Sequence, residues 1–283
     1  MTFFIIFICF GAELMWFSFA PLRASGWVST WTAWLTRTLE LRRWLGNGAP
    51  LVAVALPALV VAYFFDSVVG DSTLLSIICG CGVLLFCSGP RDVAGEIEFY
   101  KRNYVDHDDD ALPLEPENFL NQVTAVVGDP DRPYETAVAV AANDGLFAPM
   151  FWFAILGPVG PVVFRMASVL RDDAGLTAGE SAIARRLYDI ALWLPARALA
   201  FGLGLAGTLA PVFAVFGKGG FGLAHSADFL GEAALAALGS HRDDALADDD
   251  EHLGAIHAMF GLIKRGFAVW LVILALLVAA GIV

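Results

Sequence analysis

The residues of this chain that could do chemistry are a few charged or amide side chains set in or beside apolar segments: Glu13, Asn143, Asp144, Arg165, Asp189 and Arg197. A charge in an apolar segment is costly unless it meets an opposite charge or lines a cavity. We therefore predict a buried polar cluster that joins Arg165 or Arg197 to Asp144 or Asp189. Such a cluster could bind an anionic small molecule. The alternative is that both arginines extend to lipid headgroups.

Several sequence patterns that mark binding sites in other proteins do not predict a site in this chain. Residues 202–207 match G-x-G-x-x-G, but they follow no strand and lie in an apolar segment, so close packing of helices explains them better. No Walker A sequence is present, and the cysteines have no metal-ligand spacing. The histidines His241, His252 and His257 fall among acids, which favours solvated surface over a weak metal site. We expect no catalytic residue and no metal, and the sequence names no cofactor.

The composition indicates an integral membrane protein. Of 283 residues, 58% are hydrophobic and 16% are charged, whereas soluble domains are roughly half apolar and about one quarter charged. The net charge of −12 argues against nucleic acid as a partner. The acids concentrate in two runs, residues 106–110 and 243–251, and such runs are typical of solvated loops.

The apolar segments predict an all-α polytopic membrane protein with about five to six membrane or re-entrant helices, plus amphipathic interfacial and cytoplasmic helices. Residues 1–20 predict a first span, and the tryptophans and arginines of residues 26–44 predict a helix in the membrane interface. Residues 51–65 and 73–87 predict a helical hairpin whose cation-free turn faces away from the cytoplasm. The other apolar segments are residues 142–171, 192–216 and 266–283.

The most unusual of these segments is residues 142–171. It is long enough to cross a bilayer, but Pro158 and Pro161 interrupt its middle, each removing a helix donor. Glycine and proline are common in membrane helices, so we favour a packing hinge over a site. In a six-span topology the loop with Arg171, Arg185 and Arg186 falls outside, against the positive-inside rule, unless one span is re-entrant.

Two polar segments, residues 89–136 and 217–265, are expected to be loops of a single membrane domain that covers residues 1–283. The first segment has too few apolar residues for a core of its own. The second should contain a short helix at residues 229–238. Between the segments, Thr177 and Glu180 fit a capping box, and the helix that follows would place Ile183, Leu187 and Ile190 on one face.

Three segments carry a family resemblance: residues 142–170, 187–197 and 264–270 resemble AmpE. AmpE proteins are bacterial inner-membrane proteins linked by name and genetic context to β-lactamase induction. The resemblance runs over most of the chain and is poor around His107. It implies a multi-pass inner-membrane regulator or sensor in cell-wall signalling. Besides the lipid bilayer, the candidate partners are a cell-wall fragment and a membrane or cytoplasmic protein.

AmpE proteins are themselves similar to the CobD/CbiB family of cobalamin biosynthesis, which forms an amide bond. The residues that fit the pattern shared with those enzymes are Asp144-Gly145, Ala148-Pro149, Asp189 and Pro195-Ala196-Arg197. Where the enzymes carry further Glu, Asn and Asp residues, this chain carries Val140, Ala141, Ser168, Arg171 and Leu192. Amide formation needs polar groups at fixed places. The resemblance therefore implies a retained fold with lost or altered activity, and a CobD-like enzyme or a small-molecule transporter remains the alternative.

Overall fold

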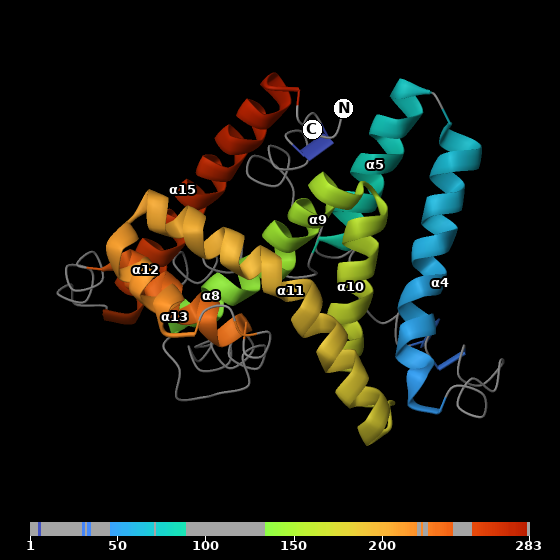
Figure 1. Ribbon diagram of the computed structural model, residues 1–283, viewed down its shortest axis with the longest axis horizontal. Helices are drawn as coiled ribbons and strands as arrows, with labels where there is room; N and C mark the ends of the chain where they lie inside the picture. Colours follow the sequence, from blue (N-terminus) through green and yellow to red (C-terminus); the bar gives the residue numbers. More distant parts are fainter. Residues whose placement is uncertain are drawn as a thin grey trace, which may run out of the picture. The chain divides into compact units, whose positions relative to one another are not determined.

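The computed structural model describes residues 5–6, 30–31, 33–34, 46–70, 72–88, 134–219, 222, 226–239 and 251–281, and these residues form an all-helical protein (Figure 1). This part of the chain contains eight helices, if the continuous run α8–η4–α9 counts as one. Four helical segments are long and apolar enough to cross a membrane: Gly46–Val69, Glu135–Leu156, Ala178–Ala206 and Ala258–Ala279. The predicted all-α class is confirmed, and the four segments suggest a multi-pass membrane protein. Most of the expected first span lies outside the described residues.

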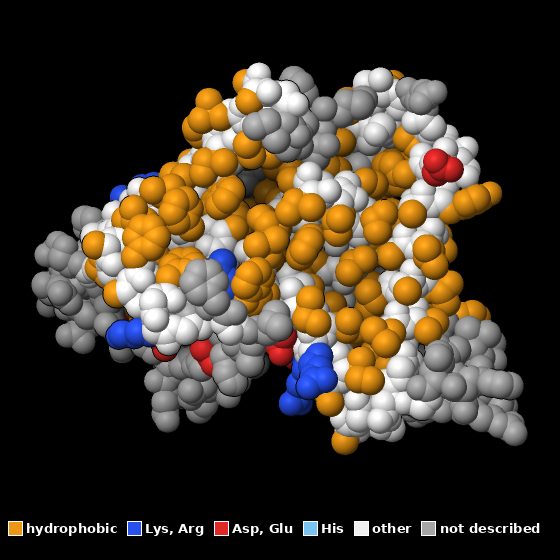
Figure 2. Space-filling model, in the orientation of Figure 1, with side chains coloured by type: hydrophobic (Ala, Val, Ile, Leu, Met, Phe, Trp, Pro, Cys, Tyr) orange, Lys and Arg blue, Asp and Glu red, His pale blue; other side chains and the backbone are white. Residues whose placement is uncertain are grey.

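Large apolar side chains lie on the outer surface of these helices. Examples are Leu59, Tyr63 and Leu74, which are 66%, 72% and 71% exposed. Figure 2 shows such side chains spread over most of the visible face. Monomeric soluble proteins rarely expose apolar surface of this extent, whereas lipid tails are its natural surroundings. The surface therefore agrees with the membrane class that the composition predicts.

The contacts divide the chain into two compact units, which are described separately below. Unit 1 comprises Met1–Arg91 and Asp144–Pro195, and unit 2 comprises Asp92–Asn143 and Ala196–Val283. Helix α11 (Ala178–Ala206) contributes residues 178–195 to unit 1 and residues 196–206 to unit 2. The sequence predicts that the chain is one membrane domain, and this stays a prediction.

Unit 1 begins with the predicted helical hairpin. Its arms are α4 (Ala49–Phe64) and α5 (Thr73–Cys87), joined by the π-helix η3 (Phe65–Val69) and a turn. Gly70 takes a left-handed conformation in this turn, with φ of 46°. Cys87, at the end of α5, packs in the same buried cluster as Ala49 at the start of α4. The chain therefore returns to the end from which α4 starts, and the hairpin is confirmed.

The segment 142–171 is not the single span that its length suggested. Helix α9 (Ala148–Leu156) ends at Gly157, which takes a φ of 62°, and α10 (Val159–Arg171) begins after Pro158. Gly160 lies so close to the backbone carbonyl of Trp152 that a Cβ at this position would overlap it. The physical reason is local, because proline cannot donate to a continuing helix and glycine alone adopts the left-handed turn without strain. The chain reverses, and α10 packs against α9, α4 and α5.

The first turns of α11 close the core of unit 1. Glu180 accepts a hydrogen bond from the Thr177 amide at 2.8 Å, and the Glu180 amide donates to the Thr177 hydroxyl at 3.4 Å, so the predicted capping box is confirmed. The buried face of the helix is not the one formed by Ile183, Leu187 and Ile190, however. Ile190 is 59% exposed, whereas the buried positions are Ala184, Tyr188 and Leu192. In a membrane protein a large aliphatic side chain can face lipid, so hydrophobicity alone does not identify the core face.

Unit 2 is built around small side chains. Helix α8 (Tyr134–Ala142) packs against α13 (Ser226–Leu238) and α15 (Glu251–Ala279). The alanines at the centre of α8 and α13 are fully buried: Ala137, Ala139, Ala233, Ala234 and Ala237. The terminal apolar segment predicted from residue 266 is thus the second half of a longer helix that starts at Glu251. The short helix expected at residues 229–238 starts slightly earlier, at Ser226.

The glycines of the G-x-G-x-x-G match at residues 202–207 allow the helices of unit 2 to pack closely. A Cβ at Gly202 would overlap the indole of Trp270 on α15, and one at Gly207 would overlap the carbonyl of Ala237 on α13. Helix α12 (Leu209–Gly217) follows, and the Thr208 hydroxyl before it donates to carbonyls at the end of α13, 2.8 Å from that of Ala236. The interpretation of the match as close helix packing is therefore confirmed.

Candidate functional site

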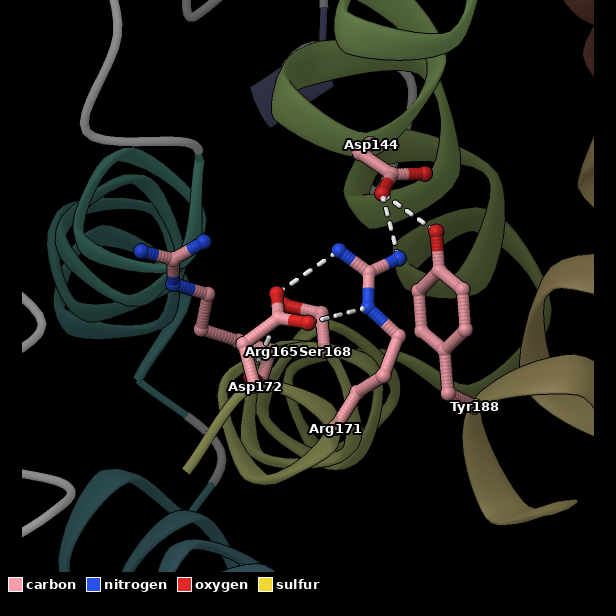
Figure 3. Close-up of polar contacts among 6 residues, drawn as sticks. All are labelled: Asp144, Arg165, Ser168, Arg171, Asp172 and Tyr188. Atoms are coloured by element: carbon pink, nitrogen blue, oxygen red, sulfur yellow. Dashed lines mark hydrogen bonds and ion pairs between the residues drawn. The ribbon is translucent and has the colours of Figure 1, made fainter. Parts of the chain in front are cut away.

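Four side chains of unit 1 form a polar cluster, shown in Figure 3. Asp144 comes from the π-helix η4 (Asn143–Phe147), Arg171 is the last residue of α10, Asp172 follows it, and Tyr188 lies on α11. We call these four residues the Asp144 cluster. It joins positions separated by up to 44 residues in the sequence.

The contacts of the cluster centre on the guanidinium of Arg171. Its Nη1 lies 3.7 Å from Oδ2 of Asp144, and the Tyr188 hydroxyl donates a hydrogen bond to the same oxygen. Its Nε and Nη2 donate to the two carboxylate oxygens of Asp172 at 2.9 and 2.8 Å. The guanidinium carbon also lies 4.1 Å from the centroid of the Tyr188 ring, within the range of a cation–π interaction.

The local structure explains these positions. A π-helix adds one residue to a helical turn and so changes which side chains face inward, and such insertions are common at functional positions. Arg171 is in the last turn of α10, where the helix dipole favours a cation. Tyr188 is 3% exposed on the buried face of α11, so its ring is fixed by packing. Three elements thus aim their polar groups at one point.

The electrostatics favour a charged cluster, although only Oδ2 of Asp144 takes part in it and the buried Oδ1 has no hydrogen-bond partner among the described residues. The Asp144 and Arg171 side chains are 15% and 17% exposed, so their attraction is only partly screened. Burial by itself lowers the pKa of Arg171, but the hydrogen bonds to Asp172 and the proximity of Tyr188 and Asp144 outweigh it and raise that pKa above the usual arginine value. One guanidinium faces two carboxylates, so the cluster offers little attraction to an anionic ligand.

The structure brings only part of the predicted set into this cluster. Asp144 is in it, whereas the guanidinium of Arg165 points away from Asp144 in Figure 3. Arg165 contributes a backbone carbonyl to the Ser168 hydroxyl at 3.1 Å. Asp189 is half-buried beside Tyr188 on α11. Glu13 lies outside the described residues, and the predicted pairing of Arg165 or Arg197 with Asp144 or Asp189 stays a prediction.

Asn143, the first residue of η4, is fully buried. Neither its amide nitrogen nor its amide oxygen has a hydrogen-bond partner within the described part of the chain. A buried amide without partners is unfavourable by roughly 1–3 kcal/mol. Asn143 is therefore a polar position that the local fold maintains at a cost in stability.

Arg197 belongs to unit 2 and has different surroundings. It is 7% exposed, so it is not a surface cation. Its Nη1 donates to the Ser226 hydroxyl and its Nη2 to the Gly222 carbonyl, both at 2.6 Å. Its guanidinium carbon lies 4.7 Å from the centroid of the Phe229 ring. Arg197 thus ties α11 to the start of α13.

Sequence reasoning missed the roles of Arg171 and Tyr188. The sequence places Arg171 among the charges of a loop and among the departures from the resembling enzymes, and Tyr188 is not among the predicted site residues. The available signal was the spacing from Ala184 through Tyr188 to Leu192, one residue per helical turn on a face that turns out to be buried. A tyrosine on such a face usually needs a hydrogen-bond partner for its hydroxyl.

No group of three or more histidine, cysteine, aspartate or glutamate side chains among the described residues could hold a metal ion. Comparisons with protein-family models, with curated proteins and with solved structures find no match to this chain. The resemblance to AmpE therefore stays a prediction.

Proposed function

We propose that this protein is a multi-pass protein of the bacterial inner membrane that acts as a regulator or sensor of the AmpE type. In this role it would take part in the cell-wall signalling that is linked to β-lactamase induction, without enzymatic activity of its own. The four candidate membrane spans support the location in a membrane. The ion pair between Asp144 and Arg171 is the observation that carries the rest.

The ion pair limits how available Asp144 is for chemistry. Asp144 fits the pattern shared with the amide-forming cobalamin enzymes, which carry an aspartate at the position of Arg171. Here that position holds a cation, and its guanidinium lies 3.7 Å from Asp144. The same carboxylate oxygen accepts a hydrogen bond from Tyr188. A carboxylate engaged in this way holds helices together and is poorly placed to activate a substrate.

A genetic experiment tests the proposed function. Deletion of the gene in its native host should change the β-lactam concentration at which β-lactamase is induced, and the wild-type gene supplied in trans should restore it. Unchanged induction in the deletion strain would contradict the proposal. The growth rate without antibiotic is the control for a general envelope defect.

A biochemical experiment separates the proposal from its alternatives. The purified protein, incubated with adenosylcobyric acid and an aminopropanol, should form no amide. Turnover would instead establish the cobalamin-type enzyme, and substrate-dependent flux in liposomes would establish a transporter. Thermal unfolding with muropeptides, nucleotides and corrinoids would identify a ligand, since a ligand at 100 times its Kd stabilises the folded state by about 2.7 kcal/mol.

A further inference from the structure

The described cations of unit 1 are concentrated on two short stretches of helix. They are Arg165 and Arg171 on the second half of α10, and Arg185 and Arg186 near the start of α11. Arg185 and Arg186 are exposed. In Figure 2, basic side chains gather over the first turns of α11. The charge of unit 1 is therefore distributed unevenly along its helices.

These stretches lie at the end of unit 1 where α4 starts. The side chain of Asn47, just before α4, lies against Gly179 in the first turn of α11. Helix α10 ends shortly before α11 begins, and Cys87 at the end of α5 shares a buried cluster with Ala49 and Leu170. Four helix ends thus meet at one place, which we call the Asn47 end. The turns at the far ends of these helices, residues 65–72 and 157–158, contain no lysine or arginine.

Apolar surface begins directly beyond the exposed arginines of α11. Ile190 and Leu194 are 59% and 38% exposed, and Ile190 lies only about 6 Å along the axis from Arg186. On α4 and the following η3 the exposed apolar side chains continue from Leu51 to Val68. A cationic turn followed by exposed aliphatic side chains is the pattern of a helix that passes from the headgroup layer into hydrocarbon.

The reversal between α9 and α10 changes the membrane topology. If residues 142–171 formed one span, the loop from α10 to α11 would lie on the side opposite to the start of that span. Because the chain turns back at Gly157, α10 returns this loop to the Asn47 end. In the sequence, Arg37, Arg42 and Arg43 precede α4, which starts at this end. The conflict with the positive-inside rule then disappears.

We propose that the Asn47 end of unit 1 faces the cytoplasm and that Arg185 and Arg186 bind anionic phospholipid headgroups of the cytoplasmic leaflet. The positive-inside rule gives the orientation. The negative surface potential of the cytoplasmic leaflet gives the binding partner, because it attracts basic residues that lie just outside the hydrocarbon layer. This inference rests on the inner-membrane location in the proposed function but not on the proposed regulatory role.

Site-directed labelling tests the orientation. Ala174→Cys lies in the exposed loop from α10 to α11, and its matched control, Ser72→Cys, lies in the exposed turn before α5. Both are made in a chain in which Cys9, Cys79 and Cys81 are replaced by serine and the buried Cys87 is kept. A membrane-impermeant maleimide should label Ser72→Cys in intact cells and Ala174→Cys only in inverted vesicles. Labelling of Ala174→Cys in intact cells would overturn the proposal.

A second measurement covers the case in which the cysteine variants fold poorly. A protease recognition sequence inserted after Ala174 in the otherwise unchanged chain should be cut in inverted vesicles and protected in intact spheroplasts. Cleavage in spheroplasts would overturn the orientation as clearly as the labelling result.

Lipid titration tests the binding partner. The purified protein should gain thermal stability from phosphatidylglycerol beyond that from phosphatidylcholine, and salt should weaken the difference. In Arg185→Gln/Arg186→Gln the affinity for phosphatidylglycerol should fall roughly tenfold or more, whereas Arg185→Lys/Arg186→Lys should keep it. Equal stabilisation of the glutamine variant and the wild type would show that these arginines do not bind the headgroups.

Discussion

Two arginines of this protein, the buried Arg197 and the partly buried Arg171, are accommodated by different chemistry. Arg171 in unit 1 faces the carboxylates of Asp144 and Asp172, and the ring of Tyr188 covers its guanidinium. The described partners of Arg197 in unit 2 are a hydroxyl, a backbone carbonyl and the ring of Phe229. Both arginines therefore use an aromatic face, and Arg171 also has two carboxylates as partners.

Each unit depends on its arginine in a different way. An ion pair leaves a charge behind when one member is removed, and a charge in low-dielectric surroundings is much more costly than an unsatisfied hydroxyl. Arg171 should therefore be the more sensitive position, and its loss should be repaired by removing the charge that remains. The substitutions below test this contrast on purified protein in detergent.

The largest effect is expected for Arg171→Leu. This change removes the cation that faces Asp144, whose side chain is only 15% exposed. The carboxylate of Asp144 then stays charged in surroundings that exclude most water. We expect the free energy of unfolding to fall by about 3 kcal/mol, as for other broken buried ion pairs. Thermal unfolding followed by tryptophan fluorescence would measure the loss.

The repair of this variant is the sharper part of the test. Adding Asp144→Asn to Arg171→Leu removes the remaining charge and should recover a large part of the lost stability. If the double variant is no more stable than Arg171→Leu, the cost comes from lost packing of the arginine, and the contrast with Arg197 loses its electrostatic basis.

A smaller loss is expected for Tyr188→Phe. The hydroxyl that donates to Asp144 disappears, but the ring that covers Arg171 stays. A hydrogen bond to a charged group contributes about 2 kcal/mol, so the free energy of unfolding should fall by that amount. Tyr63→Phe on α4 is the matched control, since Tyr63 is 72% exposed. Equal stability of Tyr188→Phe and wild type would mean that Asp144 does not need this donor.

The elements of the fold could largely be predicted from the sequence, because they depend on local chemistry. The capping box at Thr177 and Glu180, the hairpin of α4 and α5, and the close packing at Gly202 each follow from residues that are neighbours in the chain or on one helix. In the sequence, the reversal at Gly157 is seen only as an interruption of an apolar segment by glycine and proline. Whether two prolines and a glycine bend a span or reverse it depends on α4 and α5, which α10 contacts after the turn.

The cluster could be predicted only in part. A buried carboxylate at Asp144 predicts a nearby cation. The sequence contains several arginines in or beside apolar segments, and Arg165 is the one that lies inside the apolar segment 142–171. The choice of Arg171 follows from the reversal, which brings the end of α10 next to η4 and α11. A long-range pair of this kind requires the tertiary arrangement of three helices, which no local pattern contains.

In unit 2, Ser226→Ala should have a modest effect. Arg197 loses the hydroxyl that accepts at 2.6 Å but keeps the Gly222 carbonyl and the Phe229 ring. A hydrogen bond with one charged partner contributes about 1.5–3 kcal/mol, and because Arg197 keeps its other contacts we expect the free energy of unfolding to fall by about 1.5 kcal/mol. Ser72→Ala, at an exposed position, is the control. A loss as large as that of Arg171→Leu would remove the difference between the two arginines.

The smallest effect is expected for Asp172→Asn, although its hydrogen bonds to Arg171 are the shortest described for that arginine. The Asp172 side chain is 66% exposed, so water and salt screen its charge, and the two groups are neighbours in sequence. Exposed ion pairs typically contribute about 0.5 kcal/mol or less, and raising the salt concentration should reduce even that difference. Asp144→Asn, tested in parallel, should cost more despite its longer contact of 3.7 Å, because its surroundings exclude more water. If Asp172→Asn proves the more damaging of the two, distance rather than burial governs the strength of this cluster.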